Sequence, residues 1–163
     1  MGLFSSLFRK KQKAESFTTR QEKLVRTDTT FDAWTSGDLD NMLKVVTNRT
    51  NPIDRHFLLQ SIVNITYQQR KTKRYRNLCI EYAELHLQEF PTIAPALKED
   101  MDGTLPRITT FQNYAILLTE DGEFEKAISV CKLAILYGLH DNTKSGYEGR
   151  IARIKKQLEK QNT

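Results

Sequence analysis

Apolar residues recur along the chain at spacings that fit one face of an α-helix. In the clearest stretch they lie at Ala127, Cys131 and Ala134, which are three, seven and ten positions after the aromatic residue Phe124. Side chains at these spacings project from the same side of a helix. The same spacing begins again at Tyr75, so the pattern predicts at least two amphipathic helices of one kind.

A weaker copy of this pattern begins at Leu39 and fails at Arg49. The three copies start 36 and 49 residues apart. Repetition near this period is typical of helical solenoids, in which each hairpin buries its apolar face against the next one. The pattern therefore predicts an all-α stack of about six or seven helices.

Prolines mark where two further helices are expected to begin. Pro52 suits the first turn of a helix over 53–69, and Pro106 precedes a helix over 107–120. The apolar spacing in the first of these predicts that Phe57 faces the core. Each repeated pattern would then be preceded by a partner helix.

Two other residues mark where helices are expected to end. Pro91 predicts the end of a helix over 74–90, because proline lacks the backbone N–H that a helix interior needs. Residues 92–105 would then form an irregular connector. Gly138 predicts the end of a helix over 124–137, since glycine readily adopts the left-handed conformation found after helices.

Small residues, a glycine turn and an aromatic residue follow one another in the clearest hairpin. They are Ala115, Gly122, Phe124, Ala127 and Ala134. In this order they resemble the tetratricopeptide repeat, which places small residues where helices cross. The sequence departs from that family at Cys131, where an aromatic residue is usual, and at Leu139, near the usual position of a proline.

The resemblance extends unevenly over the chain. Residues 108–141 form the best repeat, and 56–91 form a looser one that lacks the glycine turn. The tail is similar to the endings of small bacterial repeat proteins of uncharacterised function. With a closing helix over 144–160, the resemblance implies one helical domain over 18–163.

The basic character of the chain lies in its first residues. Residues 1–26 hold seven basic and two acidic side chains, and the remainder carries eighteen of each sign, which accounts for the net charge of +5. Residues 1–17 are interpreted as a flexible arm, either an unmodified leader or a weak contact to an anionic membrane. The start also matches the minimal myristoylation pattern. The residues expected to touch a membrane are Leu3, Phe4, Leu7, Phe8, Arg9, Lys10 and Lys11.

The resemblance implies a concave groove lined by the first helix of each repeat. A peptide or protein partner would bind there, unless the groove is only an ordinary solvated surface. Asparagine and arginine side chains from adjacent helices could also grip a carboxylate. The implied groove residues are Gln60, Asn64, Thr109, Gln112, Asn113, Ile116, Arg150 and Arg153.

A second candidate is a run of basic residues at a turn between helices. Such a cluster could bind phosphate groups, although a solvated turn commonly carries lysine and arginine. Lys144 precedes a helix start near Gly146 and Gly149, two glycines interpreted as tight packing against the helix over 124–137. The residues of the anion hypothesis are Arg70, Lys71, Lys73, Arg74, Arg76 and Lys144.

The remaining chemistry-bearing residues indicate no enzyme. The three histidines are scattered and lack metal-ligand spacing, so neither a metal nor another cofactor is expected. Cys79 and Cys131 fall on apolar stripes and suit buried thiols in a reducing cytoplasm. No apolar run reaches the length of a membrane span.

These observations predict a non-catalytic adaptor that binds a peptide or protein in the groove. The alternative is a binder of nucleic acid or anionic membrane that uses the arm and the turn at Arg70–Arg76, with nucleic acid the less favoured partner. Because fewer than three repeats are convincing, a homodimer formed through an end helix is a third hypothesis.

Overall fold

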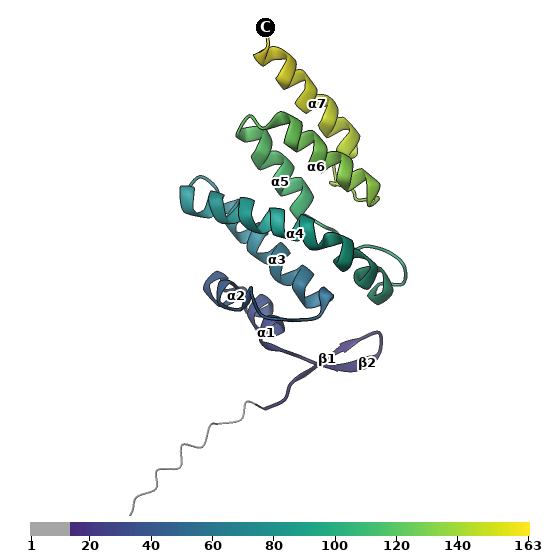
Figure 1. The fold of residues 1–163 in the computed structure, drawn as a ribbon. Coiled ribbons are helices and arrows are strands. Elements are labelled where there is room, and N and C mark those ends of the chain that lie inside the picture. Colours follow the sequence, from purple (N-terminus) through teal and green to yellow (C-terminus); the bar gives the residue numbers. More distant parts are fainter. Residues whose placement is uncertain (1–13) are drawn as a thin grey trace, which may run out of the picture.

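The computed structural model describes residues 14–163, which form a stack of helices preceded by a β-hairpin (Figure 1). The predicted membrane-contact residues lie outside this part of the chain. The elements are β1 (Phe17–Arg20), β2 (Lys23–Arg26), α1 (Thr29–Ser36), α2 (Leu39–Val45), α3 (Pro52–Gln68), α4 (Lys73–Asp100), α5 (Thr110–Glu120), α6 (Phe124–Leu136) and α7 (Gly146–Gln161). The largely helical class predicted from the sequence is confirmed, and the hairpin is an addition to it.

Successive helices lie one above another along the stack. Figure 1 shows α1 and α2 at the hairpin end, α3 and α4 in the middle, then α5 and α6, with α7 at the C-terminal end. The core runs through all of these layers: Leu58 and Ile62 of α3, Phe90 of α4 and Phe111 of α5 are fully buried. The alanines at positions 115, 127 and 134, predicted to lie where helices cross, are also fully buried.

The β-hairpin was missed in the sequence because its strands carry few apolar residues. β1 and β2 pair antiparallel, with Arg20 opposite Lys23, and the turn residues Gln21 and Glu22 both have positive φ angles of 46° and 61°. That turn geometry usually selects glycine or asparagine, so the sequence lacked the normal signal. Arg20 donates to the buried carboxylate of Asp54, which ties the hairpin to α3.

The prediction that a helix ends at Pro91 is wrong. α4 continues to Asp100 through Pro91 and Pro95, which are both exposed. Ile93 and Leu97 continue the apolar stripe and are buried. A proline inside a helix costs about 3 kcal/mol, and burial of several large side chains offsets such a cost. The connector is therefore shorter than the predicted 92–105.

The interpretation of Gly146 and Gly149 as packing against the preceding helix is also wrong. Gly146 begins α7 with a φ of 60°. A Cβ atom on Gly149 would lie 2.0 Å from Ser145 Oγ, in the turn that precedes its own helix. The two glycines are needed by the local turn that starts α7.

A candidate binding face on helices α3 and α5

Polar side chains of α3 and α5 meet where the two helices lie side by side. Asn64 Oδ1 accepts hydrogen bonds from Thr109 Oγ1 at 2.7 Å and from Asn113 Nδ2 at 2.9 Å. Gln60 Oε1 accepts from the backbone N–H of Thr109 at 2.9 Å. Four of the eight predicted groove residues are thus brought together, and we call Gln60, Asn64, Thr109 and Asn113 the amide face.

The residues of the amide face differ in how many of their hydrogen-bonding atoms are unused. Gln60 uses both ends of its amide, because its Nε2 also donates to the carbonyl of Arg107 at 3.3 Å. It therefore satisfies backbone groups at the start of α5, where Thr109 supplies no side-chain cap. Asn64 and Asn113 share one amide–amide bond, and Asn64 Nδ2 and Asn113 Oδ1 bond to no described residue.

This pair offers a donor and an acceptor side by side. Exchanging the oxygen and nitrogen of both amides would still leave one of each, so the conclusion does not depend on how the amides are oriented. Both residues are half-buried. The pair can therefore bond to any group that carries both an acceptor and a donor, as an amide does.

Gln112 and Ile116 lie on the same helix and are also half-buried. The Gln112 side chain has no hydrogen bond to a described residue. Both therefore keep part of their side-chain surface exposed on α5, the helix that carries Asn113.

Arg150 is not free in the way that the carboxylate-grip hypothesis requires. Its Nε and Nη2 atoms donate to Asp141 Oδ2 at 3.0 and 2.8 Å. The Asp141 side chain is fully buried. Burial alone would raise the pKa of this carboxyl, but hydrogen bonds from Thr143 and Arg150 hold it below its usual value. Most of the charge of Arg150 is therefore already neutralised inside the chain.

Arg153 is exposed and bonds to Ser145 Oγ at 3.0 Å through one nitrogen. It belongs to α7, which packs mainly on α6. The structure does not bring Arg153 into contact with the amide face.

An aromatic cluster extends the amide face towards α1, and the sequence analysis missed it. Trp34 stacks on Phe57 with ring centroids 4.9 Å apart, and Phe31 meets Trp34 edge-on at 5.4 Å. These three rings are only half-buried, so the prediction that Phe57 faces the core is wrong. The signal was present, because Phe57, Gln60 and Asn64 share one face of a helix.

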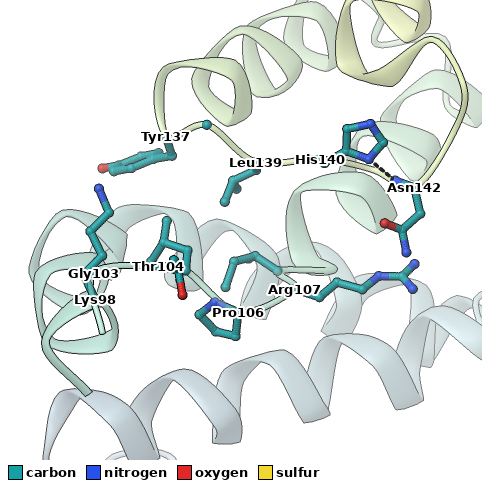
Figure 2. A pocket seen from close by; sticks show the side chains of 12 residues that line it. Lys98, Gly103, Thr104, Pro106, Arg107, Tyr137, Leu139, His140 and Asn142 are labelled. Carbon is teal, nitrogen blue, oxygen red and sulfur yellow. Dashed lines mark hydrogen bonds between the residues drawn. The ribbon is translucent and has the colours of Figure 1, made fainter. Parts of the chain in front are cut away.

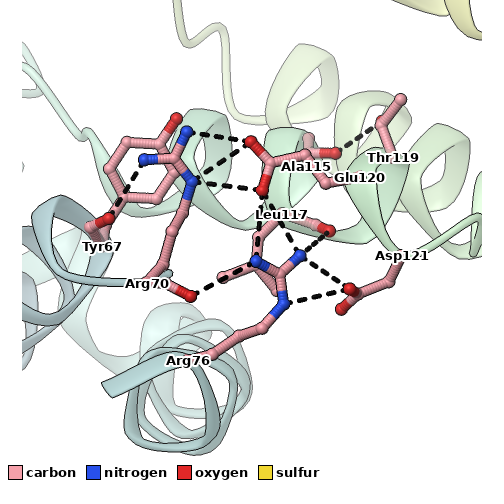
Figure 3. A network of polar contacts seen from close by, with 8 residues as sticks. All are labelled: Tyr67, Arg70, Arg76, Ala115, Leu117, Thr119, Glu120 and Asp121. Carbon is pink, nitrogen blue, oxygen red and sulfur yellow. Dashed lines mark hydrogen bonds and ion pairs between the residues drawn. The ribbon is translucent and has the colours of Figure 1, made fainter. Parts of the chain in front are cut away.

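Two arginines of the basic turn after α3 pair with acidic side chains at the C-terminal end of α5 (Figure 3). Arg70 pairs with Glu120 at 2.8 Å. Arg76 pairs with Asp121 at 2.6 Å and with Glu120 at 3.2 Å. A hydrogen bond from Arg70 is the main cause that lowers the pKa of the Glu120 carboxyl. We call Arg70, Arg76, Glu120 and Asp121 the ion-paired turn.

This occupation corrects the anion-site hypothesis. Two of its five clustered cations already hold carboxylates, and Arg70 also lies over the Tyr67 ring at 4.0 Å. Lys71, Lys73 and Arg74 remain exposed at the turn. Lys144 is exposed in a different loop, between α6 and α7.

A buried histidine pair lies beneath the amide face. His56 Nδ1 is 3.0 Å from His86 Nε2, and His86 Nδ1 is 2.8 Å from Thr110 Oγ1, so the chain of contacts joins α3, α4 and α5. Burial lowers the pKa of His56 to about 4. Burial, together with the charges of His56 and Arg55, also lowers the pKa of His86. Within residues 14–163 no group of three or more His, Cys, Asp or Glu side chains could hold a metal ion.

Both cysteines are buried free thiols, as predicted. Burial raises the pKa of Cys79 and of Cys131 to about 11. Among the described helices, none combines the length and apolar character needed to cross a bilayer.

Comparison with known proteins finds an uncharacterized protein of Aquifex aeolicus (strain VF5) that is 26% identical over 131 residues. The match covers 78% of this chain and 60% of the relative, so the chain spans less than two thirds of the relative's length. No family model matches the chain. No solved structure matches it at a significant level.

Proposed function

We propose that the protein is a non-catalytic protein-interaction module, a tetratricopeptide-like stack that binds an extended peptide segment of a partner protein across the amide face. The observation that carries this proposal is the spare donor and acceptor of the Asn64–Asn113 pair. A half-buried amide that keeps unused hydrogen-bonding capacity gains most when a ligand supplies the missing partner.

The aromatic cluster supports the same proposal. Binding energy at protein interfaces concentrates in a few aromatic and arginine side chains that are shielded from water by their neighbours. Trp34 is held in place by its hydrogen bond to Asp54 at 3.1 Å and by its stacking on Phe57. A rigid aromatic surface one helical turn from Gln60 would accommodate an apolar side chain of the bound peptide.

Peptide selection against the purified protein tests this proposal. Peptides selected from a random library should bind the intact chain. The Asn64→Ala, Asn113→Ala double variant should bind these peptides at least about tenfold more weakly. Trp34→Ala should lower the affinity for peptides that carry an apolar side chain at one end. Isothermal titration calorimetry measures each affinity.

Asn77→Ala is the matched control, because Asn77 is an exposed asparagine on α4. It should leave every affinity unchanged. Thermal unfolding of each variant separates lost binding from lost folding. Selected peptides that bind equally well to the double variant would refute the amide face as the binding site.

The phosphate-binding alternative rests on the exposed cations Lys71, Lys73 and Arg74 together with the N-terminal arm. Binding of nucleic acid or anionic vesicles through these groups should fall steeply with salt. The peptide proposal is preferred because Arg70 and Arg76 already have carboxylate partners.

Free buried thiols suit a reducing cytoplasm. Any peripheral contact with a membrane would be made by the N-terminal arm. A homodimer formed through α7 would appear as a doubled mass in analytical ultracentrifugation.

A further inference from the structure

A cavity of about 440 Å³ lies between the loop that follows α4 and the loop that joins α6 to α7. It shares no lining residue with the amide face or the aromatic cluster. Its lining includes Lys98, Arg107 and His140 but no aspartate or glutamate. Among the described residues, neither Lys98 nor Arg107 has an ion-pair partner.

The two permanent cations occupy opposite ends of this cavity (Figure 2). Lys98 lies beside the ring of Tyr137 at one end, and Arg107 lies beside the amide of Asn142 at the other. Leu139 and Pro106 lie between them. The cavity therefore presents positive charge at each end of an apolar middle.

Several features hold these groups in place. Tyr137 packs edge-on against Phe90 with ring centroids 4.7 Å apart. His140 Nδ1 accepts the backbone N–H of Asn142 at 2.8 Å, which fixes the far end of the loop. Gly138 has a φ of 69°, and the turn it makes lets the Leu139 N–H bond to the carbonyl of Ala134 at 3.0 Å. The site is thus built on ordered loops.

The unexpected length of α4 is also part of the site. Had the helix ended at Pro91, Lys98 would have lain in an irregular connector. The last turn of α4 instead carries Lys98 to the cavity. Because the sequence predicted that this helix ends at Pro91, it gave no indication that Lys98 lines a cavity.

A second cavity of similar size on α4 provides a contrast. It measures about 490 Å³, its lining includes Glu81 and Glu84, and no lysine or arginine of residues 14–163 lines it. The positive lining of the cavity at Lys98 and Arg107 therefore distinguishes it from this second cavity.

We propose that the cavity beside Lys98 and Arg107 binds an elongated small molecule that carries a negative group at each end. Arginine takes a carboxylate or a phosphate through two parallel hydrogen bonds, and lysine takes either as a point charge. The apolar middle accommodates a short hydrocarbon spacer. A cleft of this volume with a few convergent polar groups is typical of small-molecule sites.

Amide chemical-shift titration by NMR tests the proposal with four probes: adipate, 4-phosphonobutanoate, hexanoate and inorganic phosphate. Adipate or 4-phosphonobutanoate should shift the amides of Gly103, Gly138 and Asn142. The two probes with a single anionic group should bind at least about tenfold more weakly. Comparison of the first two probes shows whether the group at one end is a carboxylate or a phosphonate.

Lys98→Gln and Arg107→Gln should each weaken the preferred probe by about tenfold. Lys132→Gln is the matched control, because Lys132 is an exposed lysine on α6 that does not line the cavity. The Asn64→Ala, Asn113→Ala variant should leave probe binding intact, which separates this site from the peptide-binding proposal. Equal binding of hexanoate and adipate, shifts confined to other residues, or no saturable binding of any probe would each overturn the proposal.

Discussion

The amide face and the ion-paired turn lie on the same two helical layers but differ in how completely their polar groups are satisfied. Near the start of α5, Asn113 donates a hydrogen bond to Asn64 of α3, and each amide keeps one atom that bonds to no described residue. At the end of α5, Glu120 accepts from both Arg70 and Arg76. The first region is therefore suited to a ligand, and the second already holds its partners.

Both regions stand out in the sequence as clusters of polar residues. What separates them is the partner that the next helical layer supplies. Glu120 lies 50 residues after Arg70, and no local pattern links them. A basic run is evidence for an anion site only when the fold leaves it unpaired.

Acidification should produce the largest difference between the two regions. The buried histidine pair beneath the amide face is neutral in the folded chain, because burial lowers the pKa of His56 from 6.5 to about 4. In the unfolded chain the ring protonates near 6.5. The stability that comes from burying the neutral His56 ring is therefore fully present above pH 6.5 and is lost as pH falls towards 4. The loss lowers the free energy of unfolding by about 3 kcal/mol for His56 alone.

Hydrogen exchange, corrected for intrinsic rates, can locate this loss. Between pH 6.5 and 4.5 the amides of Asn113 and Tyr114 should lose protection before that of Glu120, because a hydrogen bond from Arg70 lowers the pKa of the Glu120 carboxyl below its usual value. A His56→Gln, His86→Gln variant should lose this pH dependence. Uniform loss of protection along α5 would contradict the prediction.

Removal of Glu120 should be the next largest effect and should act only on stability. Glu120→Ala leaves Arg70 and Arg76 half-buried with fewer partners, so the free energy of unfolding should fall by about 1 to 2 kcal/mol. Urea denaturation measures this change. Peptide affinity at the amide face should not change.

Glu159→Ala serves as the control for that measurement, because Glu159 is exposed near the end of α7 and forms no ion pair with a described residue. Its effect should be within about 0.5 kcal/mol. An equal loss from both substitutions would show that the ion-paired turn contributes nothing specific.

Salt should produce the smallest difference. Raising sodium chloride from about 0.1 to 1 M shortens the Debye length to about 3 Å. The half-exposed pairs of the ion-paired turn should then lose less than about 1 kcal/mol of stability, and the Glu120→Ala variant should be less sensitive than the intact chain. Peptide binding through neutral amides should be nearly independent of salt, which isothermal titration calorimetry can check.

The helices were predictable where the chain carries regular apolar spacing and clear end signals. The helix that begins at Phe124 follows the Gly122 turn as expected, and α3 begins at Pro52 with Asn51 as its cap. α4 was cut short because the cost of a proline is local, whereas the burial of Ile93 and Leu97 depends on their neighbours in space. The hairpin was missed because its strands carry few apolar residues, and because its contacts to Asp54 and Glu99 come from distant parts of the chain.

The candidate face was predictable only in part. Asn64, Thr109 and Asn113 were expected in one groove because the resemblance to the tetratricopeptide repeat implies that the first helix of each repeat lines it, and the structure brings these three into contact. The aromatic cluster was missed, because apolar spacing alone cannot tell a half-exposed ring from a buried one. The pairing of Arg150 with Asp141 was equally hidden.

Local sequence signals were enough to predict that this chain is mostly helical, where most of its helices begin and which small residues lie between them, because helix periodicity and capping are local properties. The packing of the helices settles which polar groups are left without an internal hydrogen-bond or ion-pair partner. Whether Asn64, Arg70 or Lys98 can bind a ligand depends on the groups that other layers place within a few ångströms, and only folding brings those groups together.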